Sequence, residues 1–436
     1  MKTGALVGRF MSQEKAYLTV DDLHVQGKTV LLRVDINAPI VDGRVEGKDR
    51  IQAAAATVDH VASKGARVII LAHQGRRGDA DFTSLREHAE ILDAFTTCRV
   101  KFVGTPPGTP TEAFGEHIWG RPALDAIRAL EPGEALMLEN VRALDEETRK
   151  GSAAEHAKAD FVRALAGVAD AFVNDAFSAA HRSQASLVGF TELLPSGAGL
   201  TMDRELTALA KAVDEPEAPA VYFLGGAKPE DSIAVMKANF SKGTLDTALL
   251  GGLVANLFLL ARGHLLGKPS MELLEKKGIM QLLPEAETLL DAYDAQILTP
   301  MDVVIKDGHG QPQTLWVDDF PVNFPILDIG PETTRMYVAE IQGAGSLMMN
   351  GPAGLYEEKP YDKGTHAILD AFAKSDAFSL LGGGHTVTAI GEFGHKFDSF
   401  GYVSLAGGAL MSYLTGETLP AVEALKHNKE KFSGKL

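Results

Sequence analysis

Short apolar runs alternate with helix-length segments along the whole chain. The short runs are apolar on both faces and rich in β-branched residues, which predicts parallel strands covered by helices on both sides of a sheet. Arg50–Lys64, by contrast, is predicted to be a helix with a small-residue face. The predicted strands are Thr29–Val34, Arg67–Ala72, Leu136–Glu139, Ala171–Asn174, Ala220–Leu224, Thr247–Leu250, Ser346–Met349, Ala377–Leu381 and Gly401–Leu405.

The length of 436 residues exceeds what one hydrophobic core usually supports, which predicts two domains. The boundary is expected at Pro195–Ala212, where glycines lead into an amphipathic helix that can serve as a hinge. The predicted fold class is α/β, with two Rossmann-like three-layer α/β/α domains of mainly parallel sheets, joined by a hinge helix across a cleft. The first domain is expected to span 1–195 and the second 196–415, with the hinge helix at about 197–212.

Composition narrows the functional classes. The net charge is −16 and no Lys/Arg run stands out, which argues against a nucleic-acid or anionic-membrane partner. A single cysteine, Cys98, excludes an intramolecular disulfide and a Cys-based zinc site, and favours a reducing, cytoplasmic setting. The longest apolar run, Leu249–Ala261, is too short to cross a bilayer and predicts a buried strand passing into a helix. Whether translation starts at Met1 or Met11 stays open.

Polar and basic side chains follow the predicted strands of the first half, in the motifs RVDIN, AHQGRR, ENVR and NDAFSAAHR. The carboxyl ends of parallel strands meet at one sheet edge, where ligands bind. Converging guanidinium groups bind phosphate and carboxylate bidentately, so the pattern predicts an anion pocket in an acidic protein. Each residue by itself is more often a surface or capping residue, so the prediction depends on their convergence. The candidates are Asp35, Asn37, Arg50, His73, Arg76, Arg142, His181 and Arg182.

Glycines follow the predicted strands of the second half instead. They allow the backbone to approach a flat ring or a phosphate closely, and the helices that come next supply N–H donors. Five such loops at one sheet edge predict a bound nucleotide. Neither GxxxxGK[ST] nor GxGxxG is present, which excludes a Walker-type site and weakens a nicotinamide-dependent dehydrogenase as the alternative. The loops are Gly225–Lys228, Gly251–Gly252, Asn350–Gly354, Gly382–Gly384 and Ala406–Ala409.

Taken in order and spacing, these motifs, with NGPAGLYE and GGGHT, resemble the phosphoglycerate kinase family from about Leu18 to Leu425. The resemblance implies a transferase that moves a phosphoryl group reversibly between 1,3-bisphosphoglycerate with ADP and 3-phosphoglycerate with ATP, in glycolysis and gluconeogenesis. It implies Mg²⁺ bound with the nucleotide, domain closure and direct in-line transfer. It also implies that the C-terminal segment 416–436 packs on the first domain. We expect a monomer, with a homodimer as the alternative.

The resemblance also assigns residues. Arg50 and Lys228 are implied to neutralise the transferring group, and no general base is needed because the acceptor is a carboxylate. Glu357 is implied to bond the ribose. The implied 3-phosphoglycerate contacts are Asp35, Asn37, Arg50, His73, Arg76, Arg142 and Arg182. The implied nucleotide contacts are Gly225, Gly226, Lys228, Asn350, Glu357, Gly382, Gly383, Gly384, His385 and Thr386.

Three positions depart from the family's common pattern. Ser232 stands where a second lysine is usual, His385 replaces the aspartate of GGGDT, and Leu405 replaces a threonine. These features resemble the archaeal branch of the family. Neutral imidazole is a poor ligand for magnesium, so the metal ligands are left unassigned. A catalytically silent relative that still binds nucleotide is the alternative that these departures raise.

Overall fold

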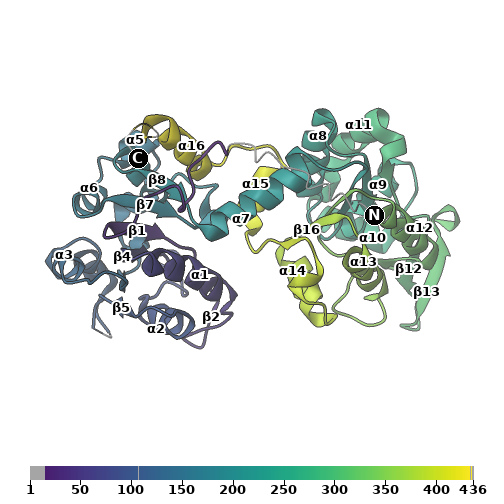
Figure 1. The fold of residues 1–436 in the computed structure, drawn as a ribbon. Helices are drawn as coiled ribbons and strands as arrows, with labels where there is room; N and C mark the ends of the chain where they lie inside the picture. The colour runs from purple at the N-terminus through teal and green to yellow at the C-terminus, as the bar shows by residue number, and fades with distance from the viewer. Residues whose placement is uncertain (1–14, 107, 433, 435–436) are drawn as a thin grey trace, which may run out of the picture. The chain divides into compact units, whose positions relative to one another are not determined.

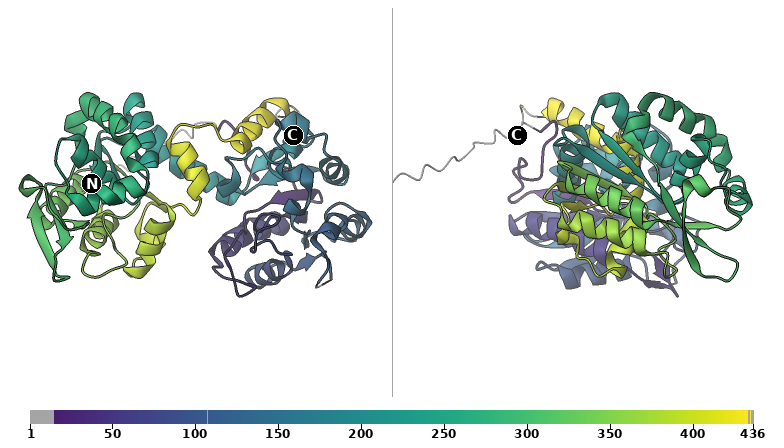
Figure 2. Two further views of the ribbon diagram at one scale, coloured as in Figure 1. Left: turned by 180° about the vertical axis from the view of Figure 1, so that it is seen from behind. Right: turned by 90° about the vertical axis from the view of Figure 1, so that its right-hand side faces the viewer.

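The computed structural model describes residues 15–106, 108–432 and 434, so both candidate starts, Met1 and Met11, lie outside the described residues. The chain divides into two compact units (Figures 1 and 2). Unit 1 comprises Met1–Ala176, Arg182–Asp203 and Pro420–Leu436, and unit 2 comprises Phe177–His181 and Arg204–Leu419.

Unit 1 is built on a six-stranded sheet in the order β5-β6-β4-β1-β7-β8. Every neighbouring pair in it is parallel. The four strands predicted for this half are confirmed to within about two residues at their ends. The edge strands β5 and β8 were not predicted. The strands are β5 (Val100–Phe102), β6 (Ala135–Met137), β4 (Arg67–Leu71), β1 (Thr29–Arg33), β7 (Ala171–Asn174) and β8 (Ser196–Ala198), with a separate hairpin of β2 (Ile40–Val41) and β3 (Arg44–Val45).

Alternate side chains of the unit 1 sheet enter two different cores. Val30 and Leu32 pack in one core, together with Val58 of helix α1. Leu31, between them, packs in the other core with Phe161 of helix α6. Both faces of the sheet are therefore buried, which is why its strands read as continuous apolar runs. The helices of this unit are α1 (Asp49–Ser63), α2 (Arg86–Phe95), α3 (Arg121–Arg128), α4 (Asp145–Thr148), α5 (Ala153–His156), α6 (Asp160–Ala166) and α16 (Pro420–Phe432).

Helix α16 is the last helix of the chain, and it packs beside the edge strand β8 (Figure 1). Its Asn428 is fully buried and carries the polar part of this contact. The Asn428 Oδ1 accepts from the backbone N–H of Ser196 at 2.8 Å, and its Nδ2 donates to the carbonyl oxygens of Thr191 and Leu194. A helix from the end of the chain thus supplies hydrogen-bond partners for backbone groups at the edge of the unit 1 sheet.

Helix α7 (Leu200–Leu209) joins the two units, because the division falls between Asp203 and Arg204. The helix was predicted to begin near residue 197, but Ser196–Ala198 is strand β8. The α-helix starts at Leu200 and continues as a π-helical turn, Ala210–Asp214. The early start was wrong because two glycines at the end of an apolar run gave no sign of strand pairing.

Unit 2 is built on a second parallel sheet, in the order β11-β10-β9-β15-β16-β17. If only the six strands of this sheet are numbered along the chain, their order is 3-2-1-4-5-6, which is that of a Rossmann fold. The order reverses between β9 and β15, and ligands bind at such a switch point. The five strands predicted here are confirmed. The strands are β11 (Ile297–Leu298), β10 (Thr247–Leu250), β9 (Ala220–Leu224), β15 (Ser346–Asn350), β16 (Phe378–Gly382) and β17 (Tyr402–Val403).

Helices cover the unit 2 sheet. Val221 and Phe223 of β9 pack with Tyr337 of α12 and Ile368 of α13, while Tyr222 between them is also fully buried. The run Leu249–Ala261 forms β10 followed by helix α9, as predicted. The helices of this unit are α8 (Pro229–Lys242), α9 (Gly252–Ala261), α10 (Lys268–Lys276), α11 (Leu283–Tyr293), α12 (Pro331–Gln342), α13 (Lys363–Lys374), α14 (Gly384–Glu392) and α15 (Gly407–Leu414).

A small antiparallel sheet in unit 2 was not predicted. It has the order β13-β12-β14 and lies at the margin of the unit (Figure 1). The α/β class with mainly parallel sheets is nevertheless confirmed. Within the part of the chain that the structure describes, no helix combines the length and apolarity needed to span a bilayer. The strands are β12 (Asp302–Lys306), β13 (Pro312–Trp316) and β14 (Ile326–Ile329).

Candidate active site

One edge of the unit 1 sheet collects residues from the ends of four strands. Asp35 and Asn37 follow β1, His73 follows β4, Arg142 follows β6, and Arg182 lies beyond β7. These strands are neighbours in the sheet, so their carboxyl ends lie together. His181 differs, because it is grouped with unit 2, where its ring packs against Gly408.

Arg50 is held toward Asp35 from the first turn of α1. Its Nη1 donates to Asp35 Oδ2 at 3.0 Å and to the carbonyl oxygen of Asn37 at 3.2 Å. The Asp35 side chain is 9% exposed, whereas that of Arg50 is 34% exposed. Asn37 adds a cross-link to the next loop, since its Oδ1 accepts from the Gly75 N–H at 2.9 Å. The ion pair is therefore preformed, while part of the guanidinium still faces solvent.

His73 is 4% exposed and is surrounded by arginines. Burial, followed by the charges of Arg33, Arg142, Arg182 and Arg50, holds the pKa of His73 well below its usual value. The ring is therefore neutral at physiological pH. Arg33 Nη2 lies 3.0 Å from Nδ1, and a guanidinium only donates, so Nδ1 accepts and Nε2 carries the proton.

Arg33 is a buried charged residue in contact with His73, and the sequence did not point to it as a candidate. It is fully buried, and its Nε donates to Ser186 Oγ at 2.8 Å. Ser186 in turn donates from Oγ to Glu147 Oε1 and from its backbone to Oε2, both at 2.7 Å. Burial raises the pKa of Glu147, and the charge of Arg33 opposes that shift. The motif RVDIN contains Arg33, but an arginine at the end of a buried strand gave no sign that it faces inward.

Four further arginines line one cavity of about 380 Å³: Arg76, Arg142, Arg182 and Arg77, the last of which pairs with Asp145 at the same cavity. Burial and the positive charge of Arg182 lower the pKa of Arg142 to about 10. Burial and the charge of Arg76 likewise lower the pKa of Arg182. Arg142 Nε is buried without a hydrogen-bond partner among the described residues. Mutually repelling cations and an orphaned donor around one cavity favour an anion between them.

Two buried amides hold the loops that carry these residues. Gln74 exchanges two hydrogen bonds of 2.9 Å with the backbone of Ala38. Asn140 Nδ2 donates to the carbonyl oxygens of Gln74 and Thr83, at 2.8 and 2.9 Å. Both amides are fully buried, so the loops after β1, β4 and β6 are fixed to one another. Sequence reasoning passed over both residues because polar residues in loops are common.

In unit 2, the glycine loops after β9, β10 and β15 are tied to one another by backbone hydrogen bonds. The Gly225 N–H donates to Asn350 at 2.9 Å, and the Gly252 N–H donates to Ala353 at 2.7 Å. Gly252 has φ +58°, and a Cβ there would come within 2.6 Å of the Gly226 carbonyl oxygen. Only glycine fits such an approach. Because the strand order reverses between β9 and β15, the loops that follow these strands lie at the switch point of the sheet.

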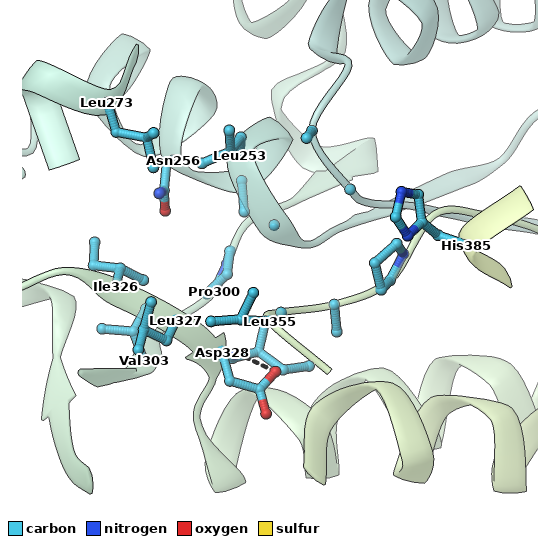
Figure 3. A pocket seen from close by; sticks show the side chains of 18 of the residues that line it. Leu253, Asn256, Leu273, Pro300, Val303, Ile326, Leu327, Asp328, Leu355 and His385 are labelled. Carbon is cyan, nitrogen blue, oxygen red and sulfur yellow. Dashed lines mark hydrogen bonds between the residues drawn. The ribbon is translucent and has the colours of Figure 1, made fainter. Parts of the chain in front are cut away.

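A largely apolar cavity of about 290 Å³ opens beside this junction. Gly226 and Pro352 line it, together with Leu253, Leu273 and Leu355. Figure 3 shows His385 at one end of the cavity and Leu273 at the other. An apolar slot with few polar groups suits a flat heteroaromatic ring.

Glu357 and His385 stand at the mouth of this cavity, and both line it. Glu357 Oε1 lies 3.4 Å from His385 Nδ1, and the hydroxyl of Tyr356 lies 3.4 Å from the same nitrogen. The His385 side chain is 73% exposed. Its aromatic and carboxylate neighbours, together with its exposure, make it a surface group at the cavity rather than a buried ligand.

The N-terminus of α14 provides backbone donors near Asn350. Gly383 has φ +90°, and a Cβ on it would come within 2.4 Å of Asn350 Oδ1. Thr386 is buried and its Oγ1 accepts from the Gly351 N–H at 2.8 Å. Gly382 packs against Leu410, so Gly383, Gly384 and His385 are the accessible residues of this loop. A helix N-terminus of this kind attracts anions.

Lys228 immediately precedes Pro229, the first residue of α8, and its side chain is exposed. Ser232, one turn later, is 1% exposed and therefore points into the unit. Asp231 is half-buried, and burial raises its pKa while Lys228 opposes the shift. The structure thus places a cation at the end of β9, beside the glycine junction.

Asp328, which the sequence reasoning also missed, lines the cavity from β14 (Figure 3). Its Oδ1 accepts from the Ile329 N–H at 2.9 Å and its Oδ2 accepts from the Gly364 N–H at 2.8 Å. Burial raises its pKa to about 7 despite these donors. Asp328 lies in the unpredicted antiparallel sheet, so no strand-end argument pointed to it.

Magnesium prefers clusters of oxygen ligands. Across residues 15–432, position 107 excepted, no group of three His, Cys, Asp or Glu side chains gathers around this glycine junction. The magnesium ligands therefore stay unassigned, as in the sequence analysis.

The chain is similar to one protein family and to curated members of that family. A family model described as "Phosphoglycerate kinase" matches residues 20–417. The curated phosphoglycerate kinase of Methanopyrus kandleri is 44% identical over 407 residues, which cover 93% of this chain and 97% of that protein. The one of Methanothermobacter thermautotrophicus is 41% identical over 420 residues, which cover 95% of this chain and 97% of that protein.

Solved structures are similar as well. The crystal structure of phosphoglycerate kinase from Pyrococcus horikoshii OT3 superposes with a TM-score of 0.83 at 36% identity, covering 95% of this chain and 100% of that one. The phosphoglycerate kinase structure from Coxiella burnetii gives a TM-score of 0.78 at 29% identity, covering 94% and 99% of the two chains.

Proposed function

Because this chain belongs to the phosphoglycerate kinase family, we propose that its two strand-end sites bind the two substrates of that family's reaction. The reaction moves a phosphoryl group between 1,3-bisphosphoglycerate with ADP and 3-phosphoglycerate with ATP in glycolysis. The resemblance predicted from the motifs is confirmed, including its archaeal character. The roles of the individual residues are proposed from the geometry of the two sites.

In unit 1, the cavity formed by Arg76, Arg142 and Arg182 is proposed to take a phosphate of the phosphoglycerate. Burial and neighbouring arginines lower the pKa values of Arg142 and Arg182, so a dianion placed among the three guanidinium groups would relieve their repulsion. Asp35 and Asn37 are proposed to hold the hydroxyl of the substrate, because carboxylate and amide oxygens accept from such a group. This arginine cavity is the observation that carries the proposal.

His73 is proposed to donate from Nε2 to an oxygen of the substrate. Arg33 supports this tautomer, because its Nη2 approaches Nδ1 at 3.0 Å and occupies the acceptor side of the ring. The low pKa of His73 keeps the ring neutral, so it provides direction without adding a further charge to the site.

In unit 2, the apolar cavity is proposed to hold the adenine base against Gly225 and Gly226, with Glu357 accepting from the ribose. Lys228, Asn350 and the N-terminus of α14, from Gly382 to Thr386, are proposed to face the phosphates. Support comes from the switch-point position of the glycine junction and from the backbone donors of α14. The nucleotide is proposed to bind as its magnesium complex, since the family typically uses Mg²⁺.

Charge compensation is the proposed catalytic task of Arg50 and Lys228. Phosphoryl transfer needs two oxygens in line and cations around the moving group, with little covalent chemistry from the protein. The acceptor carboxylate is already ionised at pH 7, so no side chain has to remove a proton. Since the residues proposed for each substrate belong to different units, the substrates have to be brought together, and domain closure stays a prediction.

A coupled assay tests the proposal. Purified protein supplied with 1,3-bisphosphoglycerate and Mg-ADP should form ATP, and Arg142→Ala together with Arg182→Ala should raise the KM for the bisphosphoglycerate at least tenfold. Intact Mg-ADP binding without turnover would instead favour the catalytically silent relative. A rise in melting temperature with NAD(H) but not with Mg-ADP would favour the dehydrogenase. A monomer working in the cytoplasm is proposed, with size-exclusion chromatography as the check on the oligomeric state.

A further inference from the structure

Three potential metal ligands gather in unit 2, away from the glycine junction. His366 and Asp370 lie one helical turn apart on α13, and His395 lies in the loop that follows α14. One ligand atom from each side chain lies within 4.8 Å of the other two. Helices α13 and α14 are neighbours in the fold (Figure 1).

The distances match those between ligands of one small cation. His395 Nε2 lies 3.2 Å from Asp370 Oδ1, and His366 Nε2 lies 3.8 Å from the same oxygen. Two ligand atoms at about 2.1 Å from a tetrahedral zinc are about 3.4 Å apart. Asp370 Oδ1 therefore lies near this separation from both imidazole nitrogens.

The His395–Asp370 contact lacks the geometry of a hydrogen bond. His395 Nε2 is buried and has no hydrogen-bond partner among the described residues, although the carboxylate oxygen is only 3.2 Å away. The ring nitrogen is therefore directed beside the oxygen rather than at it. A buried ring nitrogen normally has a hydrogen-bond partner or a metal bound to it, so the unpaired Nε2 of His395 points to a ligand.

The surrounding contacts fix the three side chains in place. The His366 ring stacks on Phe393 with centroids 4.6 Å apart, and the His395 ring meets Phe400 edge-on at 5.9 Å. Lys374 Nζ approaches the other carboxylate oxygen of Asp370 at 3.3 Å, which leaves Oδ1 facing the imidazoles. Because these side chains are already held in one rotamer, they lose less conformational entropy when a metal binds.

We propose that His366, Asp370 and His395 form a site for a divalent transition metal, with Zn²⁺ as the best match. Two imidazoles and one carboxylate suit zinc, whereas magnesium prefers oxygen ligands. Water completes the tetrahedron, since His366 is 49% exposed. The metal joins α13 to the C-terminal end of α14, whose N-terminus belongs to the proposed phosphate site. Its effect is to stabilise unit 2 rather than to take part in transfer.

Zinc binding by the full-length, tag-free chain tests the site. After dialysis against EDTA and then metal-free buffer, calorimetric titration with Zn²⁺ should show one ion per chain and a rise in melting temperature. His366→Gln, Asp370→Asn and His395→Gln should each weaken binding by about tenfold or more, because a three-ligand site loses one ligand. His60→Gln is the matched control, since His60 pairs with Asp21 at 2.7 Å and the described residues around it supply no third ligand.

Two outcomes would overturn the proposal. One is a wild-type affinity for Zn²⁺ equal to that of all three variants, which would place the bound ion elsewhere. The other is a loss of melting temperature in His366→Gln that is the same with and without Zn²⁺, which would make the cluster a packing contact. His366→Gln is suited to this comparison because the exposure of His366 allows the variant to fold. ATP formation by the variants should stay at the wild-type rate.

Discussion

Unit 1 and unit 2 are each built on a parallel sheet with a proposed ligand site at the carboxyl ends of its strands, but the two sites are made of different groups. The unit 1 edge uses charged side chains, with Arg76, Arg142 and Arg182 around one cavity. The unit 2 edge uses bare backbone, with Gly226 and Gly252 in left-handed conformations beside an apolar cavity. The architecture is common to both units, so specificity lies in the residues that follow each strand.

The two solutions carry different costs. Clustered arginines repel one another, and burial together with that repulsion lowers the pKa values of Arg142 and Arg182. A glycine junction has no such repulsion, but it tolerates no side chain where a Cβ would meet the backbone within 3 Å. Unit 1 should therefore be sensitive to loss of charge, and unit 2 to addition of atoms.

The largest effect is expected from Arg50→Ala. Loss of a preorganised cation from the transferring group should lower kcat by about 10²–10³-fold. The Kd for Mg-ADP should stay within about twofold of wild type, because Arg50 belongs to unit 1. Steady-state kinetics and calorimetry check the two quantities.

Arg44→Ala is the control for this variant. Arg44 also lies in unit 1 but is 79% exposed and pairs loosely with Glu87 at 3.6 Å. Its kcat should equal that of wild type. A near-normal kcat for Arg50→Ala would remove Arg50 from the catalytic role.

The next effect is expected from Gly252→Ala, which adds one atom to the glycine junction. The new Cβ would lie 2.6 Å from the Gly226 carbonyl oxygen at a left-handed φ, so the loops have to shift. We expect the Kd for Mg-ADP to rise at least tenfold and the Kd for 3-phosphoglycerate to stay unchanged.

Gly278→Ala separates crowding from backbone strain. Gly278 also has a left-handed φ, of +71°, but a Cβ there meets nothing within 4 Å. This control should cost only the strain of about 1–2 kcal/mol in stability. Equal nucleotide affinity in the two alanine variants would show that close packing at Gly252 has no part in binding.

A smaller effect is expected from Asp328→Asn and should depend on pH. Burial raises the pKa of Asp328 from its ordinary 3.8 to about 7 in the folded state. Between those values the folded protein keeps a proton that the unfolded chain releases, so rising pH destabilises the wild type. Relative to wild type, the variant should gain about 1.4 kcal/mol in unfolding free energy per pH unit across this window. Urea unfolding at pH 5, 6 and 7 checks the trend, which a constant difference would contradict.

The smallest effect is expected from His385→Gln. The imidazole is 73% exposed and its 3.4 Å contact with Glu357 is a surface pair, worth about 0–1 kcal/mol. The Kd for Mg-ADP should therefore change by no more than about fivefold. A loss comparable to that of Gly252→Ala would mean that a side chain, and not bare backbone, dominates nucleotide recognition in unit 2.

Strands were predictable where both faces of a sheet are buried. Leu31 and Val221, for example, sit in apolar runs whose central residues are all buried. The polar residues after those runs were predictable as neighbours, because parallel strands end at one edge. Edge strands such as Ser196–Ala198 were not predictable, because a strand of three small residues, one of them glycine, is too short to show a periodic pattern.

The supporting residues of the site depended on long-range contacts that no local pattern encodes. Arg33 is separated by 153 positions from Ser186, to which it donates. Asp328 reaches the cavity from an antiparallel sheet whose strands are partly exposed and lack continuous apolar runs. Fold class therefore follows from periodicity, whereas the orientation of a buried arginine follows only from its partners.

The position of α16 has a consequence for the order of events during synthesis. Unit 2 lies within the stretch up to Leu419, so its sheet can form while α16 is still inside the ribosome. The unit 1 sheet emerges first yet lacks Asn428, which satisfies backbone groups around Leu194 and Ser196. The first-made unit is thus finished last. Ala198 of β8 can pair early with Leu18 and Val20, but until α16 arrives the Ser196 end of the strand lacks its partner and is open to chaperones or to other chains.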